Sequence, residues 1–295
     1  MTPLDHPPHG LRHDLDRLSA QWHEQRALNA ASLQRRQTMG RLAAGVASLA
    51  GLTPVGGCAV RADEAAAAST NGGSGGGSGC TVIPAETAGP FPGDGSNRAS
   101  GALANVLSLS DIVRADIRSS IGGLSGIAAG VPLNLTLTLV NTGSQCAPLA
   151  GRAIYLWQCD REGRYSMYSS GVTRQNYLRG VQVTNDAGQV SFQTTFPGCY
   201  PGRWPHIHFE VFSSLAVASR GANAIRTSQL ALPRAACTEV FNNASGYSAS
   251  VAHFAAISLA SDFVFGDTAA ASQMAALAGN LAKGYDAALT VGLAG

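Results

Sequence analysis

Two histidines stand two positions apart in HIHFEVF, residues 206–212, shortly after Tyr200. In a β-strand, residues two apart point to the same side, so His206 and His208 present both imidazoles to one face while Ile207 faces the other. Two imidazoles on one face can chelate one metal ion. The pair alone leaves zinc, copper and iron open, and such pairs also occur as ordinary surface or core histidines.

Two tyrosines narrow the choice of metal. Tyr200 follows an FPG turn before this strand, and Tyr165 ends GRY, which follows a second strand-like segment, YLWQCD. A phenolate is a hard anionic donor that stays deprotonated at neutral pH only on a strongly Lewis-acidic ion. Ferric iron meets this need best, because two phenolates and one hydroxide neutralise Fe³⁺ and leave little uncompensated buried charge. These residue types therefore favour a ferric centre.

Alternating segments predict the strands that would position these side chains. In VPLNLTLTLV, residues 131–140, leucines occupy one face and Asn or Thr the other, which is the pattern of a half-buried strand. Similar segments, each bounded by Gly, Pro, Asn or Asp, span residues 153–159, 189–196, 206–212 and 227–233. Short strands at this spacing predict an all-β fold, an antiparallel β-sandwich with long loops and little helix.

Two further segments carry local predictions. NDAG, residues 185–188, predicts a hairpin turn, because Asn, Asp and Gly tolerate the backbone angles that such turns require. Residues 269–295 leave two possibilities open, a helix in the first half and a closing strand over DAALTVGL, residues 286–293.

The beginning of the chain reads as an export leader. Adjacent arginines in SLQRRQTMG precede a short, mildly apolar stretch, residues 42–55, as in a twin-arginine signal. VGGC then ends at Cys58 and resembles the lipobox of bacterial lipoproteins. An ordinary secretory leader cut near AVRA stays open. We predict an exported protein, lipid-anchored at the cell envelope through Cys58 or secreted.

The composition after this leader separates a tether from a folded domain. Residues 58–79 are dominated by Gly, Ser and Ala, the composition of a flexible tether. We therefore predict a signal region over residues 1–57, a tether over 58–79 and one domain over 80–295. Five cysteines remain in that domain, so two disulfides are the most that can form, and the sequence leaves their pairing open.

The charge balance excludes one class of partner. Residues 1–57 carry six arginines and four acids, and the rest of the chain has equal numbers of basic and acidic residues. Without a basic excess or a Lys/Arg cluster, the domain releases few counterions from a polyanion, so we predict no nucleic-acid partner.

Five motifs follow one another along the domain: ETAGPFPGD, YLWQCDREGRYS, DAGQVSFQTTFPGCY, RWPHIHF and TSQLAL. In kind and order they resemble the intradiol ring-cleavage dioxygenases, the family of the catechol and protocatechuate 3,4-dioxygenases. The likeness spans about Cys80 to Phe265 and is greatest to exported, single-domain bacterial members. The sequence shows no long N-terminal helical region of the sort that builds the dimer interface in catechol 1,2-dioxygenases, so the oligomeric state stays open.

This resemblance implies a mononuclear non-haem Fe(III) on a β-sandwich. It implies that O₂ cleaves catechol-type rings between the two hydroxyl-bearing carbons, giving cis,cis-muconate-type products. The ligands it implies are Tyr165, Tyr200, His206 and His208.

Matching to the family also implies roles around the metal. Tyr200 is the exchangeable ligand, whereas Tyr165 stays bound. Arg203 stabilises negative charge that develops on the substrate, and Gln229 orients substrate or oxygen intermediates by hydrogen bonding.

Several alternatives stand beside this interpretation. Tyr168 or Tyr177 could replace Tyr165 as the metal ligand, and His253 is expected to be structural. The H-x-H pair could hold zinc or copper in an unrelated enzyme. The chain could also be a non-catalytic, transthyretin-like β-sandwich that binds a partner at the cell surface and needs no iron.

Overall fold

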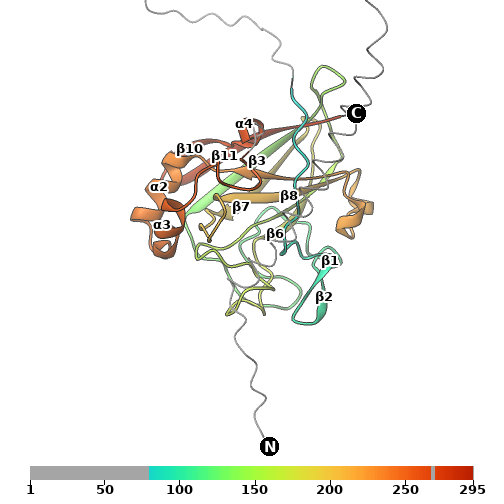
Figure 1. The fold of residues 1–295 in the computed structure, drawn as a ribbon. Helices are drawn as coiled ribbons and strands as arrows, with labels where there is room; N and C mark the ends of the chain where they lie inside the picture. The colour runs from blue at the N-terminus through green and yellow to red at the C-terminus, as the bar shows by residue number, and fades with distance from the viewer. Residues whose placement is uncertain (1–79, 267–269, 295) are drawn as a thin grey trace, which may run out of the picture. The chain divides into compact units, whose positions relative to one another are not determined.

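The computed structural model describes residues 80–266 and 270–294 (Figure 1). The predicted leader, the predicted tether and Cys58 lie outside these residues. The described residues belong to one compact unit. In the part of the chain that is described, no helix is long and apolar enough to cross a membrane.

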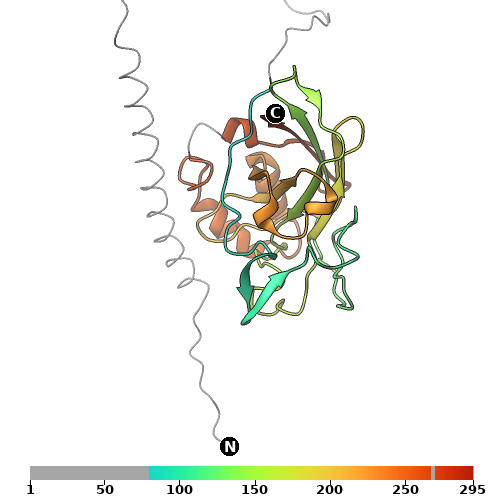
Figure 2. The same cartoon turned by 90° about the vertical axis from the view of Figure 1, so that its right-hand side faces the viewer.

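Two β-sheets and a separate hairpin make up this unit. The first sheet has the order β10 (Ala276–Asn280), β11 (Gly284–Leu293), β3 (Pro132–Asn141) and β4 (Ala147–Pro148), with β7 (Gln189–Thr195) also paired to β3. The second sheet has the order β6 (Arg179–Val183), β5 (Ala153–Trp157), β8 (His206–Phe212) and β9 (Arg226–Ala231). The hairpin consists of β1 (Asp94–Ala99) and β2 (Ala102–Asn105), and it projects at the lower end of the view in Figure 2.

Short helices follow β8 and β9. The 3-10 turns η1 (Leu215–Val217) and η2 (Gly221–Asn223) lie between β8 and β9, and α2 (Arg234–Asn243), α3 (Ser248–Ala255) and α4 (Ala270–Gln273) come after β9. In Figure 1, α2 and α3 lie at the side of the sheets away from the β1–β2 hairpin. The all-β sandwich with little helix is therefore confirmed for the described residues.

A shared apolar core lies between the two sheets. The leucines of β3 are buried while Asn134 is exposed, as the alternation predicts. Ile154 and Leu156 of β5 and Ile207 and Phe209 of β8 join the same core cluster. Burying each of these large side chains contributes about 1.5–3 kcal/mol, so this layer stabilises the packing of the two sheets on each other.

The second sheet is buried on both faces, and this creates the site. Every residue of β5 and of β8 is buried. The face turned away from the first sheet carries Tyr155 and Trp157, and it is covered by loops that bring Tyr165 and Tyr200 into one cluster with them. Because loops cover this face of the second sheet, polar side chains that project from it are shielded from water.

Two local predictions are corrected by the strand pairing. The hairpin expected at residues 185–188 is wrong: the turn forms, with Gly188 N–H donating to Asn185 O at 2.8 Å, but it joins β6 of one sheet to β7 of the other. The sandwich is also not antiparallel throughout, because β11 pairs in parallel with β3 from Tyr285–Leu133 to Leu293–Asn141.

The structure decides between the helix and the strand that the sequence left open in the last described segment of the chain. The closing strand is confirmed as β11, whereas the expected helix is reduced to α4 and is followed by the strand β10. β10 and β11 form an antiparallel hairpin.

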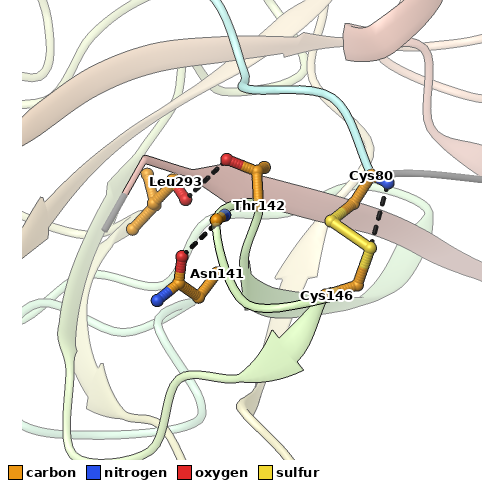
Figure 3. The surroundings of a disulfide bond; sticks show 6 residues. Cys80, Asn141, Thr142, Cys146 and Leu293 are labelled. Carbon is orange, nitrogen blue, oxygen red and sulfur yellow. Dashed lines mark hydrogen bonds between the residues drawn. A yellow bond between two sulfur atoms is a disulfide. The ribbon is translucent and has the colours of Figure 1, made fainter.

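A disulfide fixes the start of the described chain to the first sheet. Cys80 is bonded to Cys146 in the turn after β3, and beside it Thr142 donates to Leu293 O at the end of β11 (Figure 3). Ile83 N–H then donates to Gly292 O at 2.8 Å, which lays the segment after Cys80 along β11. The other three described cysteines, Cys159, Cys199 and Cys237, are free and buried.

Candidate metal centre

Strand β8 places the two histidines on the loop-covered face of the second sheet. His208 lies opposite Trp157 of β5 and opposite Gln229 of β9. Its ring stacks on Trp157 with centroids 4.9 Å apart and an interplanar angle of 11°. His206 is oriented by a hydrogen bond from Nδ1 to the carbonyl of Trp204, which leaves Nε2 free to bind.

Two loops must approach each other closely to bring in the tyrosines, and two glycines allow this. A Cβ on Gly198 would lie 2.6 Å from Arg161 O, and Gly198 N–H donates to Asp160 O at 3.0 Å. Gly163 has φ +80°, and a Cβ there would lie 3.1 Å from Tyr200 Cβ. The loop before β8 therefore packs directly on the loop that carries Tyr165.

A buried cation also holds the Tyr165 loop. Arg179 is fully buried, and its guanidinium donates to Ser166 Oγ and Ser166 O, to Phe91 O, to Pro92 O and to Tyr155 Oη at 2.6–3.1 Å. Ser166 is the neighbour of Tyr165, and the ring of Phe91 lies 5.0 Å from that of Tyr165. Arg179 thus joins β6, the segment before β1 and the tyrosine loop.

The four predicted ligands converge on one point. The distance from Tyr165 Oη is 3.5 Å to Tyr200 Oη, 3.4 Å to His206 Nε2 and 3.2 Å to His208 Nε2. His206 Nε2 also lies 3.2 Å from Tyr200 Oη and 3.1 Å from His208 Nε2. Donor atoms that share one metal ion through bonds of about 2 Å lie about 3 Å apart, so these separations fit a common ion.

The donor types fit a metal that accepts phenolate. Among the described residues, no group of three or more His, Cys, Asp or Glu side chains could hold a metal ion. A centre at this place therefore depends on the two tyrosine oxygens. All four side chains are buried, with Tyr200 the most exposed at 8%.

Burial sets the protonation states of the four groups. It lowers the pKa of His206 well below its usual value, helped by the charge of Arg203, and it lowers the pKa of His208 likewise. The histidines are therefore neutral, which is the form that binds metals. Burial raises the pKa of Tyr165 well above its usual value and that of Tyr200 to about 12, so the phenolates form only when a cation compensates them.

Arg203 and Gln229 lie beside these donors. Arg203 Nη1 is 3.4 Å from His206 Nε2, and Arg203 Nη2 donates to Gln229 Oε1 at 2.6 Å. Gln229 Nε2 donates in turn to Thr87 O at 2.8 Å. The structure thus brings all six predicted site residues into one buried network.

The competing residues lie in other hydrogen bonds. Tyr168 Oη donates to Asn97 at 2.7 Å, and Tyr177 Oη donates to Asp160 at 3.1 Å. His253 Nδ1 bonds to Cys199 O at 2.8 Å, in the structural role expected for it. Of the three candidate tyrosines, Tyr165 is the one that touches Tyr200 and both histidines.

Sequence reasoning missed three residues that shape the site. Arg179 and Trp157 sit in strands where their types carry no special signal, and Asp262 lies outside all five motifs. Asp262 is 1% exposed, and its Oδ2 pairs with Arg203 Nε at 2.9 Å. Only the tertiary fold brings these groups together, since 59 residues separate Asp262 from Arg203.

Comparison with known sequences supports the resemblance over part of the chain. Residues 123–230 match the family model described as Dioxygenase. A catechol 1,2-dioxygenase from Candida albicans is 35% identical over 60 residues, which is 20% of each chain. A hydroxyquinol 1,2-dioxygenase from a Rhizobium species is 39% identical over 54 residues, or 18% of each chain. The chain thus matches about a fifth of the length of these relatives.

Comparison with solved structures addresses the fold. An intradiol ring-cleavage dioxygenase from Tetranychus urticae superposes with a TM-score of 0.53 at 23% identity, covering 73% of this chain and 95% of that one. At this identity the match speaks for the fold alone. The resemblance predicted from the five motifs is confirmed: in sequence and in fold this chain is similar to the intradiol ring-cleavage dioxygenases.

Proposed function

We propose that the protein is a non-haem Fe(III) intradiol dioxygenase. It cleaves catechol-type rings with O₂ between the two hydroxyl-bearing carbons and forms cis,cis-muconate-type products. The observation that carries this proposal is the convergence of two phenol oxygens and two imidazole nitrogens, 3.1–3.5 Å apart, from four buried side chains. Phenolate donors favour a ferric ion over zinc or copper.

Tyr165, Tyr200, His206 and His208 would hold this ion. When bound, a ferric ion supplies a Lewis acid that promotes ionisation of the catechol hydroxyls and an electron acceptor that makes the ring reactive toward O₂. Because the histidines are neutral, two phenolates and one hydroxide would balance the charge of Fe³⁺, so the centre can stay buried.

Tyr200 is placed to take up a proton from the substrate. Burial raises the pKa of Tyr200 to about 12, although the charge of Arg203 lowers it. Without a compensating cation the protonated phenol is therefore the stable form of Tyr200, more so than for an ordinary tyrosine, whose pKa is about 10. Tyr200 Oη would hold the proton that a catechol hydroxyl gives up as the substrate binds. Tyr165 keeps its position, because Arg179 fixes the adjacent Ser166.

Arg203 and Gln229 act on the bound substrate. The guanidinium edge beside His206 Nε2 stabilises negative charge on a substrate oxygen at that place, and it does so without reorganising, since its other nitrogens are already bonded. Gln229 holds one side of this guanidinium and faces His208 across the sheet. Both residues orient the catechol and its oxidised forms.

The cellular setting belongs to the same proposal. Export of the domain, with a lipid anchor at Cys58 or release, is supported by the disulfide Cys80–Cys146, because disulfides persist in oxidising compartments. Small catechols and O₂ are the proposed partners, with no nucleic acid.

Oxygen uptake with catechol, protocatechuate and hydroxyquinol, followed by identification of the products, tests the function. We expect consumption of one O₂ per ring and a cis,cis-muconate-type product from at least one of the three. Folded, iron-loaded protein that consumes no O₂ with any of them contradicts the proposal and favours a non-catalytic β-sandwich.

A further inference from the structure

A carboxylate outside the predicted site lies at the centre of a dense set of hydrogen bonds. Asp262, in the turn after α3, is 1% exposed. Its Oδ2 accepts from Arg203 Nε at 2.9 Å and from Trp204 N–H at 2.7 Å. Its Oδ1 accepts from Val264 N–H at 2.8 Å and from Phe265 N–H at 3.0 Å. Both carboxylate oxygens are therefore fully used.

These bonds fix the direction of the Arg203 guanidinium. The group is planar, so holding two of its nitrogens determines where the third points. Asp262 holds Nε, Gln229 holds Nη2, and the remaining Nη1 faces His206 Nε2 at 3.4 Å. The guanidinium carbon also lies 4.5 Å from the centre of the Phe263 ring, which follows Asp262 in the chain.

The charge of Asp262 matters as well as its shape. Arg203 is 4% exposed, so a counter-charge is required to keep this cation buried beside the metal-binding donors. Asp262 and Arg203 form the most deeply buried ion pair in the described part of the chain, with side chains 0% and 5% exposed. An asparagine at this position would keep the shape but would lose the charge and one acceptor.

We propose that Asp262 is a positioning residue for ring cleavage, acting through Arg203, whose guanidinium it aims at substrate oxygens bound next to His206. This inference rests on the function proposed above. It goes beyond a structural role for Asp262 in the turn at residues 262–265, and the two roles predict different results in a double-mutant cycle.

The cycle combines Asp262→Asn with Arg203→Met and measures kcat, KM and the dissociation constant of catechol, the last by anaerobic titration of the visible absorption. In the wild-type background we expect Asp262→Asn to lower kcat/KM by about 10- to 100-fold, the usual effect of losing a partner that orients a site residue. We expect iron content to stay unchanged. In the Arg203→Met background the same substitution should change kcat/KM by less than about 2-fold, because the guanidinium that Asp262 orients is absent.

Thermal unfolding of the iron-loaded variants gives a readout that is independent of activity. If the two side chains act as a pair, the double variant unfolds at a higher temperature than the sum of the single shifts predicts. Asp116→Asn is the matched control, since it removes the carboxylate from an exposed pair with Arg118, and it should leave catalysis unchanged.

Two results would overturn the inference. One is an Asp262→Asn protein with the catalytic constants of the wild type, and the other is an equal loss in both backgrounds, which would mean a purely structural role. If Asp262→Asn does not fold, Arg203→Lys tests the same point, because lysine keeps the charge but has a single nitrogen in place of the three guanidinium nitrogens that lie at Asp262, Gln229 and His206. Wild-type kcat/KM in Arg203→Lys would then refute the inference. A wild-type protein that does not cleave catechols would instead contradict the proposed function.

Discussion

The tyrosines determine which chemistry the site can perform. Two histidines from one strand would serve many metals, but burial raises the pKa of both Tyr165 and Tyr200, so their phenolates exist only on a strongly acidic ion. Among the residues that the structure describes, His208 Nδ1 has no hydrogen-bond partner, and the His208 ring stacks on Trp157. Aromatic packing against Trp157 thus contributes to the orientation of this ring.

Phenylalanine substitutions test the two tyrosines separately. Phenolate bound to Fe(III) absorbs visible light by charge transfer, so Tyr165→Phe and Tyr200→Phe should each weaken and shift the visible band of the iron-loaded protein, and the double variant should lose it. Tyr168→Phe removes a neighbouring phenol that bonds to Asn97, and we expect it to leave the band unchanged. An unaltered band in the double variant would exclude tyrosine ligation.

Among the elements, the two loops that meet over the second sheet decide whether the ligands converge. β8 alone supplies the histidines, in the register that the H-x-H pattern predicts. The tyrosines arrive on loops whose backbones touch at Gly198, where there is no room for a side chain. The site therefore depends on backbone contact between the loop that follows β5 and the loop that precedes β8.

A methyl group at Gly198 should separate these loops. In Gly198→Ala the new Cβ would overlap Arg161 O and Gly163 N, and overpacking of this kind costs about 1–3 kcal/mol. We expect a lower melting temperature and weaker iron binding, measured by thermal denaturation and by titration with a chelator. Gly143→Ala is the control, because its nearest neighbour would be an ordinary contact at 3.4 Å. Equal iron affinity in the two variants would show that the loop contact does not set the site.

At the scale of the whole molecule, the disulfide and β11 fix the two ends of the described domain to the first sheet. Cys80 is joined to Cys146 across 66 residues, and the segment after it lies along β11, which itself pairs with β3. The two ends of the described domain are thus held at one place on the first sheet.

Removing the disulfide should destabilise the domain without altering the site. We expect the Cys80→Ser/Cys146→Ser double variant to lose about 2–4 kcal/mol of unfolding free energy, since the bridge restricts a long loop in the unfolded chain. Denaturant titration with and without a reductant measures this. The wild type should approach the variant when reduced, and the variant should not respond. Wild-type stability in the variant would show that the bridge contributes nothing.

The sequence was most informative where chemistry and local pattern coincide. The strand at residues 206–212, the leucine face of β3 and the candidate ligands Tyr165, Tyr200, His206 and His208 could all be predicted from alternation and motif. The sequence could not predict which sheet the strand after the turn at residues 185–188 would join. A turn motif determines local backbone angles but not the sheet in which the next strand pairs. The parallel pairing of β11 and the contacts of Asp262 and Arg179 are likewise decided by long-range packing.

The visible absorption and iron content of the purified, iron-replete protein test the central claim most directly. We predict one ferric ion per chain and a broad visible band from phenolate-to-iron charge transfer, which changes when catechol is added without oxygen. Correctly folded protein that binds no ferric iron, or binds it without a visible band, would contradict the assignment of two tyrosines and two histidines to one metal centre.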